Sequence, residues 1–331
     1  MIIVKTPLRI SFVGGGSDMQ DFYNQADGKV VCTAIDKFVY AIVKARFDDM
    51  IYINYSRKEC VEKVADIKHD LVREAMRLTG VEKGIEITTL ADIPSSGSGL
   101  GSSSSITVAL LHALHAYRNE LVTAEQLAQD ACRIEIDILG KPIGRQDQYA
   151  AAYGGVNRFV FQRGDVTQRL PVAMESKANR KFAASLLLYY TGITRSADKI
   201  LSRQKSNLQS TDRFAAMQEM VALVDPFTEA MQQQDIAACG DLLARNWQLK
   251  QNMATGISNS EIDEMHDRAI SAGALAGKVA GAGGGGFLLL IVPREKQNDV
   301  FAAMQAYREL PFMLAESGSK VIFDDRSYAS K

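Results

Sequence analysis

The segment between Pro94 and Ile106 constrains this chain more than any other. It reads "SSGSGLGSSSS", so Leu100 is its one residue other than glycine or serine, and it carries no charge. Such composition is typical of flexible linkers. Here, however, the β-rich run "IEITTL" precedes it and the helix-patterned run "ITVALLHAL" follows it. A loop of such small residues, joining a strand directly to a helix, indicates a backbone that lies close against another group.

The group that best suits this loop is a phosphate. The first N–H groups of a helix have no partner within the helix, and the helix dipole adds partial positive charge there. The pattern predicts a helix over 103–118 with a serine as its N-cap. Because the loop contains no lysine, its backbone would supply most of the anion contacts; a purely structural turn is the alternative. The predicted phosphate loop comprises Pro94, Ser95, Ser96, Gly97, Ser98, Gly99, Leu100, Gly101, Ser102, Ser103 and Ser104.

Two common phosphate-binding patterns do not describe this loop. The Walker pattern needs a lysine after its last glycine, and the dinucleotide pattern needs a third glycine where Ser102 stands. Gly281, Gly283 and Gly286 do have the dinucleotide spacing, but "FLLLIV" follows them, which predicts a strand where that pattern needs a helix. A dinucleotide-dependent oxidoreductase is therefore a weak alternative.

The bulk composition excludes several classes. The chain has 331 residues, 47% of them hydrophobic, which suits two domains or one large one. Its net charge of −1 argues against a nucleic-acid or membrane-surface partner. Lys5 and Arg9 interrupt the first apolar run, so we expect no signal peptide. The four scattered cysteines suit a reducing compartment, and we expect a cytoplasmic protein.

Strand and helix patterns alternate along the whole chain. We expect a strand over 2–13, a strand pair over 29–47 and 51–56, a helix over 68–79, and a helix over about 124–139 capped by Thr123. After a soft boundary near 170–180, a strand leads into three or four long helices across 196–272, and a last strand lies near 319–323. This mixture predicts an α+β protein.

Three stretches in this order resemble the GHMP kinase superfamily, and together they span nearly the whole chain. They are "TPLRISFVGGGSD" at 6–18, "PSSGSGLGSSSS" at 94–105 and "KVAGAGGGGFLLLI" at 278–291. Within the superfamily, the first stretch and "GRQDQYAAAYGG" at 144–155 are most similar to kinases of D-glycero-D-manno-heptose 7-phosphate. Fucokinases have a similar opening. Galactokinases have an acidic residue and a histidine before the aspartate of this first stretch. This chain has Gly15-Gly16-Ser17-Asp18 there instead, which counts against galactose.

The resemblance implies a fold and an activity. The fold would be the GHMP kinase fold: an N-terminal domain like ribosomal protein S5 domain 2 over 1–175 and a C-terminal ferredoxin-like domain over 176–331. The expected cofactors are ATP, bound between the domains, and Mg²⁺. The expected reaction phosphorylates the anomeric hydroxyl of the heptose 7-phosphate; a free-sugar 1-kinase is the main alternative, and a non-catalytic sensor is another. The partner would be a small sugar phosphate, and the protein a monomer or a homodimer.

The resemblance also assigns the chemical roles. Asp147 would accept the proton of the sugar hydroxyl, with Arg9 beside it to neutralise charge. From the residues alone, Asp147 could equally be a helix N-cap and Arg9 a surface residue. Glu135 would bind Mg²⁺ together with a hydroxyl of the loop, Ser103 or Ser104.

The sugar would lie on the glycine-rich stretches. Asp18 would bind sugar hydroxyls, or would simply be a turn residue. The 7-phosphate would need its own cations, for which Arg145, Arg195 and Lys199 are candidates. The remaining expected substrate contacts come from Gly15, Gly16, Ser17, Gly283 and Gly284.

Overall fold

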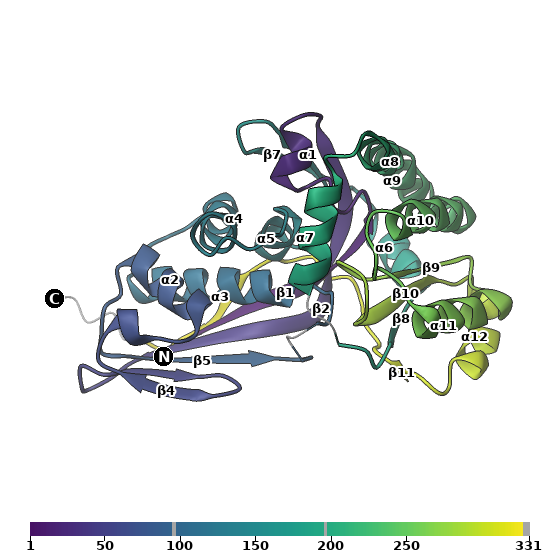
Figure 1. Ribbon diagram of the computed structural model, residues 1–331. Helices are drawn as coiled ribbons and strands as arrows, with labels where there is room; N and C mark the ends of the chain where they lie inside the picture. Colours follow the sequence, from purple (N-terminus) through teal and green to yellow (C-terminus); the bar gives the residue numbers. More distant parts are fainter. Residues whose placement is uncertain (95–96, 195–196, 327–331) are drawn as a thin grey trace.

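The computed structural model describes residues 1–94, 97–194 and 197–326. Its strands form two sheets, each covered by helices, as Figure 1 shows. The strands of the first sheet are β1 (Ile2–Val13), β2 (Gly28–Ala45), β3 (Ile51–Asn54), β4 (Lys58–Val61), β5 (Ile85–Ala91), β6 (Val156–Gln162), β7 (Val166–Pro171) and β12 (Lys320–Asp324). Those of the second sheet are β8 (Leu186–Tyr190), β9 (Ala276–Val279), β10 (Phe287–Ile291) and β11 (Arg308–Glu309).

Helices connect the strands of both sheets. The helices of the first half are α1 (Gln20–Tyr23), η1 (Val64–Asp66), α2 (Asp70–Thr79), α3 (Ser102–Tyr117), α4 (Ala124–Cys132), η2 (Arg133–Ile138) and α5 (Gln146–Tyr153). Those of the second half are α6 (Ser176–Ala183), α7 (Ala197–Asn207), α8 (Thr211–Ala222), α9 (Val224–Gln233), α10 (Ile236–Gln251), α11 (Ser260–Ser271), η3 (Arg294–Lys296) and α12 (Gln297–Ala303).

The first sheet has the order β12-β1-β2-β5-β3-β4, and β6 and β7 extend it from β2. The long strand β2 pairs with β6 through its first residues and with β5 through its last. The predicted pair of β2 and β3 is wrong, because β5 lies between them and runs parallel to β3. A parallel pair needs a crossover, and β4 and α2 supply it. Local periodicity predicts a strand but does not select its partner.

Helix α3 packs against β1 and β2 and buries Val108, Leu110 and Leu111. It begins at Ser102, and its N-cap is Gly101 in the left-handed region with no capping side chain, so the expected serine cap is wrong. A side chain at Gly101 would approach the Arg9 side chain to about 3.1 Å. The predicted helix after Thr123 is confirmed in its first part, where the Thr123 hydroxyl accepts from the Gln126 N–H. It continues as η2, a turn of π-helix.

The second sheet is buried on both faces. Leu186 and Leu188 of β8 belong to the core shared with the first sheet, whereas Leu187 and Tyr189 pack with α11 and α12. This alternation explains why β8 and β10 are continuous apolar runs. The described residues from 197 to 271 form five helices instead of three or four, because Gln234 in the left-handed region ends α9 and Asp235 caps α10.

The chain crosses between the halves more than once. Strand β12, near the C-terminus, pairs with β1 and so returns to the first sheet (Figure 1). The division of the chain at residue 175 therefore stays a prediction. Among the described residues, no helix has the length and apolar character needed to cross a membrane.

Candidate active site

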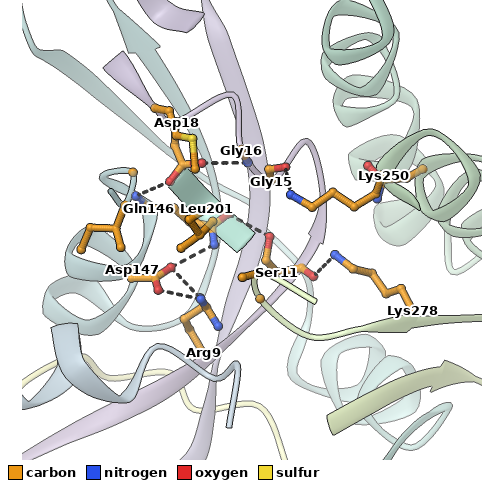
Figure 2. Close-up of a pocket in the computed structure, with 16 residues that line it drawn as sticks. Arg9, Ser11, Gly15, Gly16, Asp18, Gln146, Asp147, Leu201, Lys250 and Lys278 are labelled. Carbon is orange, nitrogen blue, oxygen red and sulfur yellow. Dashed lines mark hydrogen bonds and ion pairs between the residues drawn. The ribbon is translucent and has the colours of Figure 1, made fainter. Parts of the chain in front are cut away.

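A small cleft of about 70 Å³ opens where β1 ends, between elements of both halves. Arg9 and Ser11 both face it, because alternate residues of a strand point to the same side. Figure 2 shows that the charged side chains around it are Arg9, Asp18, Asp147, Lys250 and Lys278.

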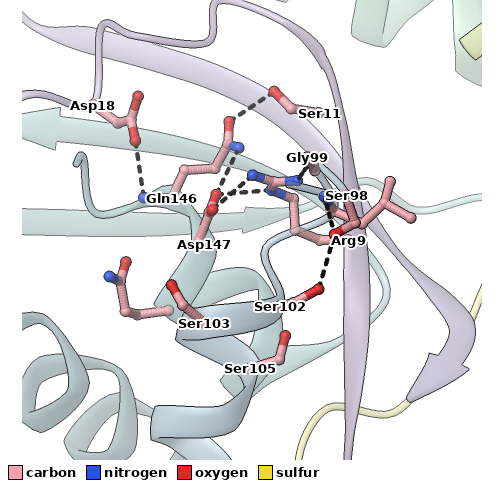
Figure 3. A network of polar contacts seen from close by, with 12 residues as sticks. Arg9, Ser11, Asp18, Ser98, Gly99, Ser102, Ser103, Ser105, Gln146 and Asp147 are labelled. Atoms are coloured by element: carbon pink, nitrogen blue, oxygen red, sulfur yellow. Dashed lines mark hydrogen bonds and ion pairs between the residues drawn. The ribbon is translucent and has the colours of Figure 1, made fainter. Parts of the chain in front are cut away.

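Arg9 and Asp147 form a two-pronged ion pair. The Arg9 Nε donates to Asp147 Oδ1 over 2.7 Å, and Nη2 donates to Oδ2 over 2.6 Å. The third nitrogen, Nη1, donates to the carbonyl of Gly99 over 2.6 Å (Figure 3). Asp147 lies in the first turn of α5, which begins at Gln146, so it is not the helix N-cap. Because the Arg9 side chain is 6% exposed, this geometry is tightly held.

Asp18 is fixed by backbone donors. Its two oxygens accept from the N–H of Gly16 over 2.9 Å and of Gln146 over 3.1 Å. Burial and the nearby Asp147 raise its pKa, and these two hydrogen bonds partly offset the rise. Gly144 makes the arrangement possible, since a Cβ there would lie about 2.0 Å from Asp18 Oδ2. Asp18 lines the cleft, and its bond to Gly16 also fits a turn, so its contact with sugar hydroxyls stays a prediction.

The predicted phosphate loop follows β5 and leads into α3. Gly97, Gly99 and Gly101 all have positive φ, which glycine adopts without strain. The hydroxyls of Ser98 and Ser102 lie 3.0 Å apart at the start of the helix. Gly99 lies against the second glycine-rich loop, because a Cβ there would meet the Ala280 carbonyl at about 2.3 Å. Ser95 and Ser96 lie outside the described residues.

Glu135 and Ser103, which were predicted together, lie together. Glu135 is fully buried in η2, and its Oε1 accepts from the Ser103 hydroxyl over 2.9 Å. Lys141 Nζ lies 3.4 Å from the same oxygen, and Gln148 donates to the other. One carboxylate and one hydroxyl beside a phosphate loop form a donor set that suits Mg²⁺, which takes few protein ligands and completes its shell with phosphate oxygens and water.

Among the other predicted substrate residues, some line the cleft and others are bonded to residues beside it. Gly15 and Gly16 line it, and the Ser17 hydroxyl donates to the Gly14 carbonyl, closing the turn before Asp18. Arg145 is buried beside the cleft, where it donates to the Asp165 carbonyl and lies 3.4 Å from its carboxylate.

The second glycine-rich loop and the last phosphate candidates are arranged differently. Gly283 and Gly284 lie against Ile257, whereas the neighbouring Gly281 and Ala282 line the cleft. The loop joins the antiparallel strands β9 and β10, an arrangement unlike a dinucleotide-binding turn. Lys199 is exposed, and Arg195 lies outside the described residues.

Sequence reasoning missed the two lysines of the cleft, Lys250 and Lys278, and the neighbouring Asn246. Lys250 lies on the same side of α10 as Asn246, four residues earlier, and donates to the Gly15 carbonyl and to Gln204. Lys278 projects from β9 and donates to the carbonyls of Ser11 and Phe12. The available signal was a lysine inside the otherwise apolar strand "AGKV", since a buried lysine is rare.

Comparison with known families agrees with this architecture. The family model for the GHMP kinases N terminal domain matches residues 59–155, which include the phosphate loop, Glu135 and Asp147. The model for the GHMP kinases C terminal domain matches residues 227–309, which include Lys250, Lys278 and the second glycine-rich loop.

Individual relatives match nearly the whole chain. It is 29% identical over 316 residues to D-glycero-alpha-D-manno-heptose 7-phosphate kinase from Campylobacter jejuni, covering 92% of this chain and 93% of the relative. It is 26% identical to the Arabidopsis thaliana bifunctional fucokinase/GDP-fucose pyrophosphorylase, over 92% of this chain but 31% of that protein. The crystal structure of a D-glycero-D-manno-heptose 1-phosphate kinase from Bacteroides thetaiotaomicron superposes with a TM-score of 0.82, 25% identity, and coverage of 99% and 100% of the two chains. This chain therefore belongs to the GHMP kinase superfamily, and it is a phosphotransferase.

Proposed function

We propose that the protein is an ATP-dependent sugar kinase that phosphorylates the anomeric hydroxyl of D-glycero-D-manno-heptose 7-phosphate. The observation that carries the proposal is the Arg9–Asp147 pair, which faces a cleft that Asp18 also lines. The similarity to a heptose 7-phosphate kinase over 92% of this chain supports the choice of acceptor.

Asp147 would act as the base. A carboxylate offers about four lone-pair sites. Arg9 uses two of them, and Gln146 Nε2, at 3.2 Å from Oδ1, uses a third. One site is left for the proton of the acceptor hydroxyl. The hydroxyl oxygen then forms a bond to the γ-phosphorus, the bond from that phosphorus to the bridging oxygen breaks, and ADP leaves with the electron pair.

Arg9 would connect the base to the nucleotide. It holds Asp147 with two nitrogens and the Gly99 carbonyl of the phosphate loop with the third. The base and the loop therefore keep a fixed separation, which is what an in-line transfer requires. The Arg9 charge would also stabilise the transferring phosphoryl group.

Ser103 and Glu135 would hold Mg²⁺, which neutralises phosphate charge when it is bound. Their oxygens already lie 2.9 Å apart at the N-terminal end of α3. Lys141 Nζ lies 3.4 Å from Glu135 Oε1. When Mg²⁺ binds to Glu135, Lys141 would either leave this carboxylate or stay beside it as a second cation for the phosphates.

The experiment is an ADP-release assay over heptose 7-phosphate, L-fucose, galactose and mannose, with phosphorus NMR to identify the product. We expect the highest kcat/KM with heptose 7-phosphate and a new anomeric phosphate signal. A higher kcat/KM with free L-fucose would favour the free-sugar 1-kinase, the alternative that similarity to the fucokinase supports. ATP-independent binding of NADH without any ADP release would contradict both.

A further inference from the structure

We propose that Asn246, Lys250 and Lys278 form an anion subsite, here called the lysine subsite, that holds the phosphate of the acceptor. The inference rests on the proposed function, because it supplies the subsite for the phosphate group of that substrate. All three side chains line the cleft, and each is at least 95% buried.

Within the described part of the chain, neither buried lysine forms an ion pair with an acidic side chain, although Asp18 favours the charge on Lys250 from across the cleft. Among the described residues, Lys250 and Lys278 donate only to three backbone carbonyls and the amide oxygen of Gln204. The other cations near the cleft are paired, Arg9 with Asp147, Arg145 with Asp165 and Lys141 with Glu135. A buried charge without a counter-charge is costly, so an anionic ligand would be strongly favoured here.

The subsite has unused donors. An ammonium group has three N–H bonds, and each lysine uses two of them. The Oδ1 atom of Asn246 accepts from Gly14 N–H over 3.1 Å, which fixes the orientation of its amide. Its Nδ2 is buried and has no partner within the described part of the chain. Three nitrogen atoms, with four N–H bonds between them, therefore remain for phosphate oxygens.

The subsite lies apart from the phosphate loop. The loop contacts β1 at Arg9, whose N–H donates to the Leu100 carbonyl. Lys278 contacts Ser11 and Phe12, which follow Arg9 in β1 by two and three residues. Lys250 contacts Gly15, in the loop after β1. At about 3.3 Å per residue, Ser11 and Phe12 lie ~7–10 Å along the strand from Arg9. Figure 2 shows the lysines on one side of the labelled residues and Asp147 on the other. An acceptor with its anomeric end at Asp147 would direct its far end to the lysines.

The electrostatics agree with a phosphate ligand. Burial lowers the pKa of Lys250 to about 8, although Asp18 opposes the shift. Burial, Lys250 and Arg9 lower the pKa of Lys278 to about 7. A bound phosphate would raise both pKa values, so binding above pH 7 should take up protons.

The test uses Lys250→Met and Lys278→Met, which remove the charge and keep the length of the side chain. A lost charged hydrogen bond corresponds to a loss of about 10- to 150-fold. We expect KM for heptose 7-phosphate to rise by about that factor, with KM for ATP within twofold of the wild-type value. Lys205→Met is the matched control, since Lys205 lines the adjoining cavity, is paired with Asp21 and lies outside the subsite. It should change neither constant.

A second measurement does not depend on turnover. Inorganic phosphate is titrated calorimetrically into the nucleotide-free protein at pH 8, in two buffers of different ionisation enthalpy. We expect binding with proton uptake in the wild type and weaker binding in both methionine variants. Asn246→Asp keeps the acceptor for Gly14 and adds a negative charge, so it should also weaken binding even if a methionine variant folds poorly.

The outcomes separate the two proposals. If heptose 7-phosphate is not a substrate but phosphate binding depends on the lysines, the proposed function fails and the subsite stands. If phosphate affinity and KM for heptose 7-phosphate are unchanged in all three variants, the subsite is refuted. If the loss falls on KM for ATP instead, the lysines bind the nucleotide and the proposal is equally wrong.

Discussion

At the residue scale, the proton acceptor gives the sharpest prediction. Asp147→Asn keeps the size of the side chain but replaces the acceptor with an amide, so Arg9 keeps one oxygen partner. We expect kcat to fall by roughly 10²- to 10⁴-fold, the usual worth of a positioned base, with KM for ATP nearly unchanged. Steady-state kinetics with ATP and acceptor varied separately would measure both. Near-normal turnover would mean that Asp147 only anchors Arg9.

The sequence could anticipate some contacts of this site and not others. Two pairs of residues were expected to act together, Arg9 with Asp147 and Ser103 with Glu135. The structure brings each pair within hydrogen-bond distance. Lys250 and Lys278 contact carbonyls 235 and 267 residues away in sequence. A backbone carbonyl leaves no trace in the residue letters, so no local pattern could reveal these partners.

At the scale of elements, the phosphate loop gives the second prediction. Gly99→Ala places a methyl group in the left-handed region and about 2.3 Å from the Ala280 carbonyl. Gly164→Ala is the matched control, because Gly164 also has positive φ but has open space around its Cβ position. The backbone strain, ~1–2 kcal/mol, is common to both.

The difference between the two alanine variants therefore isolates the contact between the loops. We expect Gly99→Ala to lower Tm further than Gly164→Ala and to raise KM for ATP, which Gly164→Ala should leave unchanged. Thermal melting and ATP kinetics would decide. Equal shifts in Tm, with no change in KM, would contradict a close and functional contact.

Elements were predicted more reliably than their pairing. The strand over 2–13 and the helix over 68–79 agree with β1 and α2 to within two residues, because their periodicity is strong. The partner of β3 depends on a parallel crossover, and Glu135 in η2, where the helix changes after Cys132, contacts Gln148 of α5. Neither is encoded in a short window of residues.

At the scale of the whole molecule, buried cations join the two sheets beside the apolar core that they share. Lys278 of the second sheet donates to two carbonyls of β1 in the first, and Lys250 of α10 donates to the loop that follows β1. The two lysines that connect the sheets therefore also line the cleft. Such an arrangement makes the stability of the whole chain depend on the protonation of groups in the site.

The last prediction concerns that dependence on pH. An unfolded lysine has a pKa near 10.4, whereas folding lowers that of Lys278 to about 7 and that of Lys250 to about 8. Between these values the unfolded chain binds more protons, so the free energy of unfolding should rise with pH. Below about pH 7 both states are protonated, and the cost of burial is fully present.

Urea unfolding at pH 7, 8 and 9 in phosphate-free buffer would measure the slope. For the wild type, Lys278 should add on the order of 1 kcal/mol per pH unit, since one pKa unit corresponds to about 1.4 kcal/mol. Lys278→Met should lose that part of the slope and be more stable than the wild type at pH 7, because an apolar side chain has no charge to bury. Other titrating groups contribute to both proteins and cancel in the difference. Parallel slopes would mean that Lys278 keeps its proton in the folded protein, with the cost of burial met by polar contacts alone.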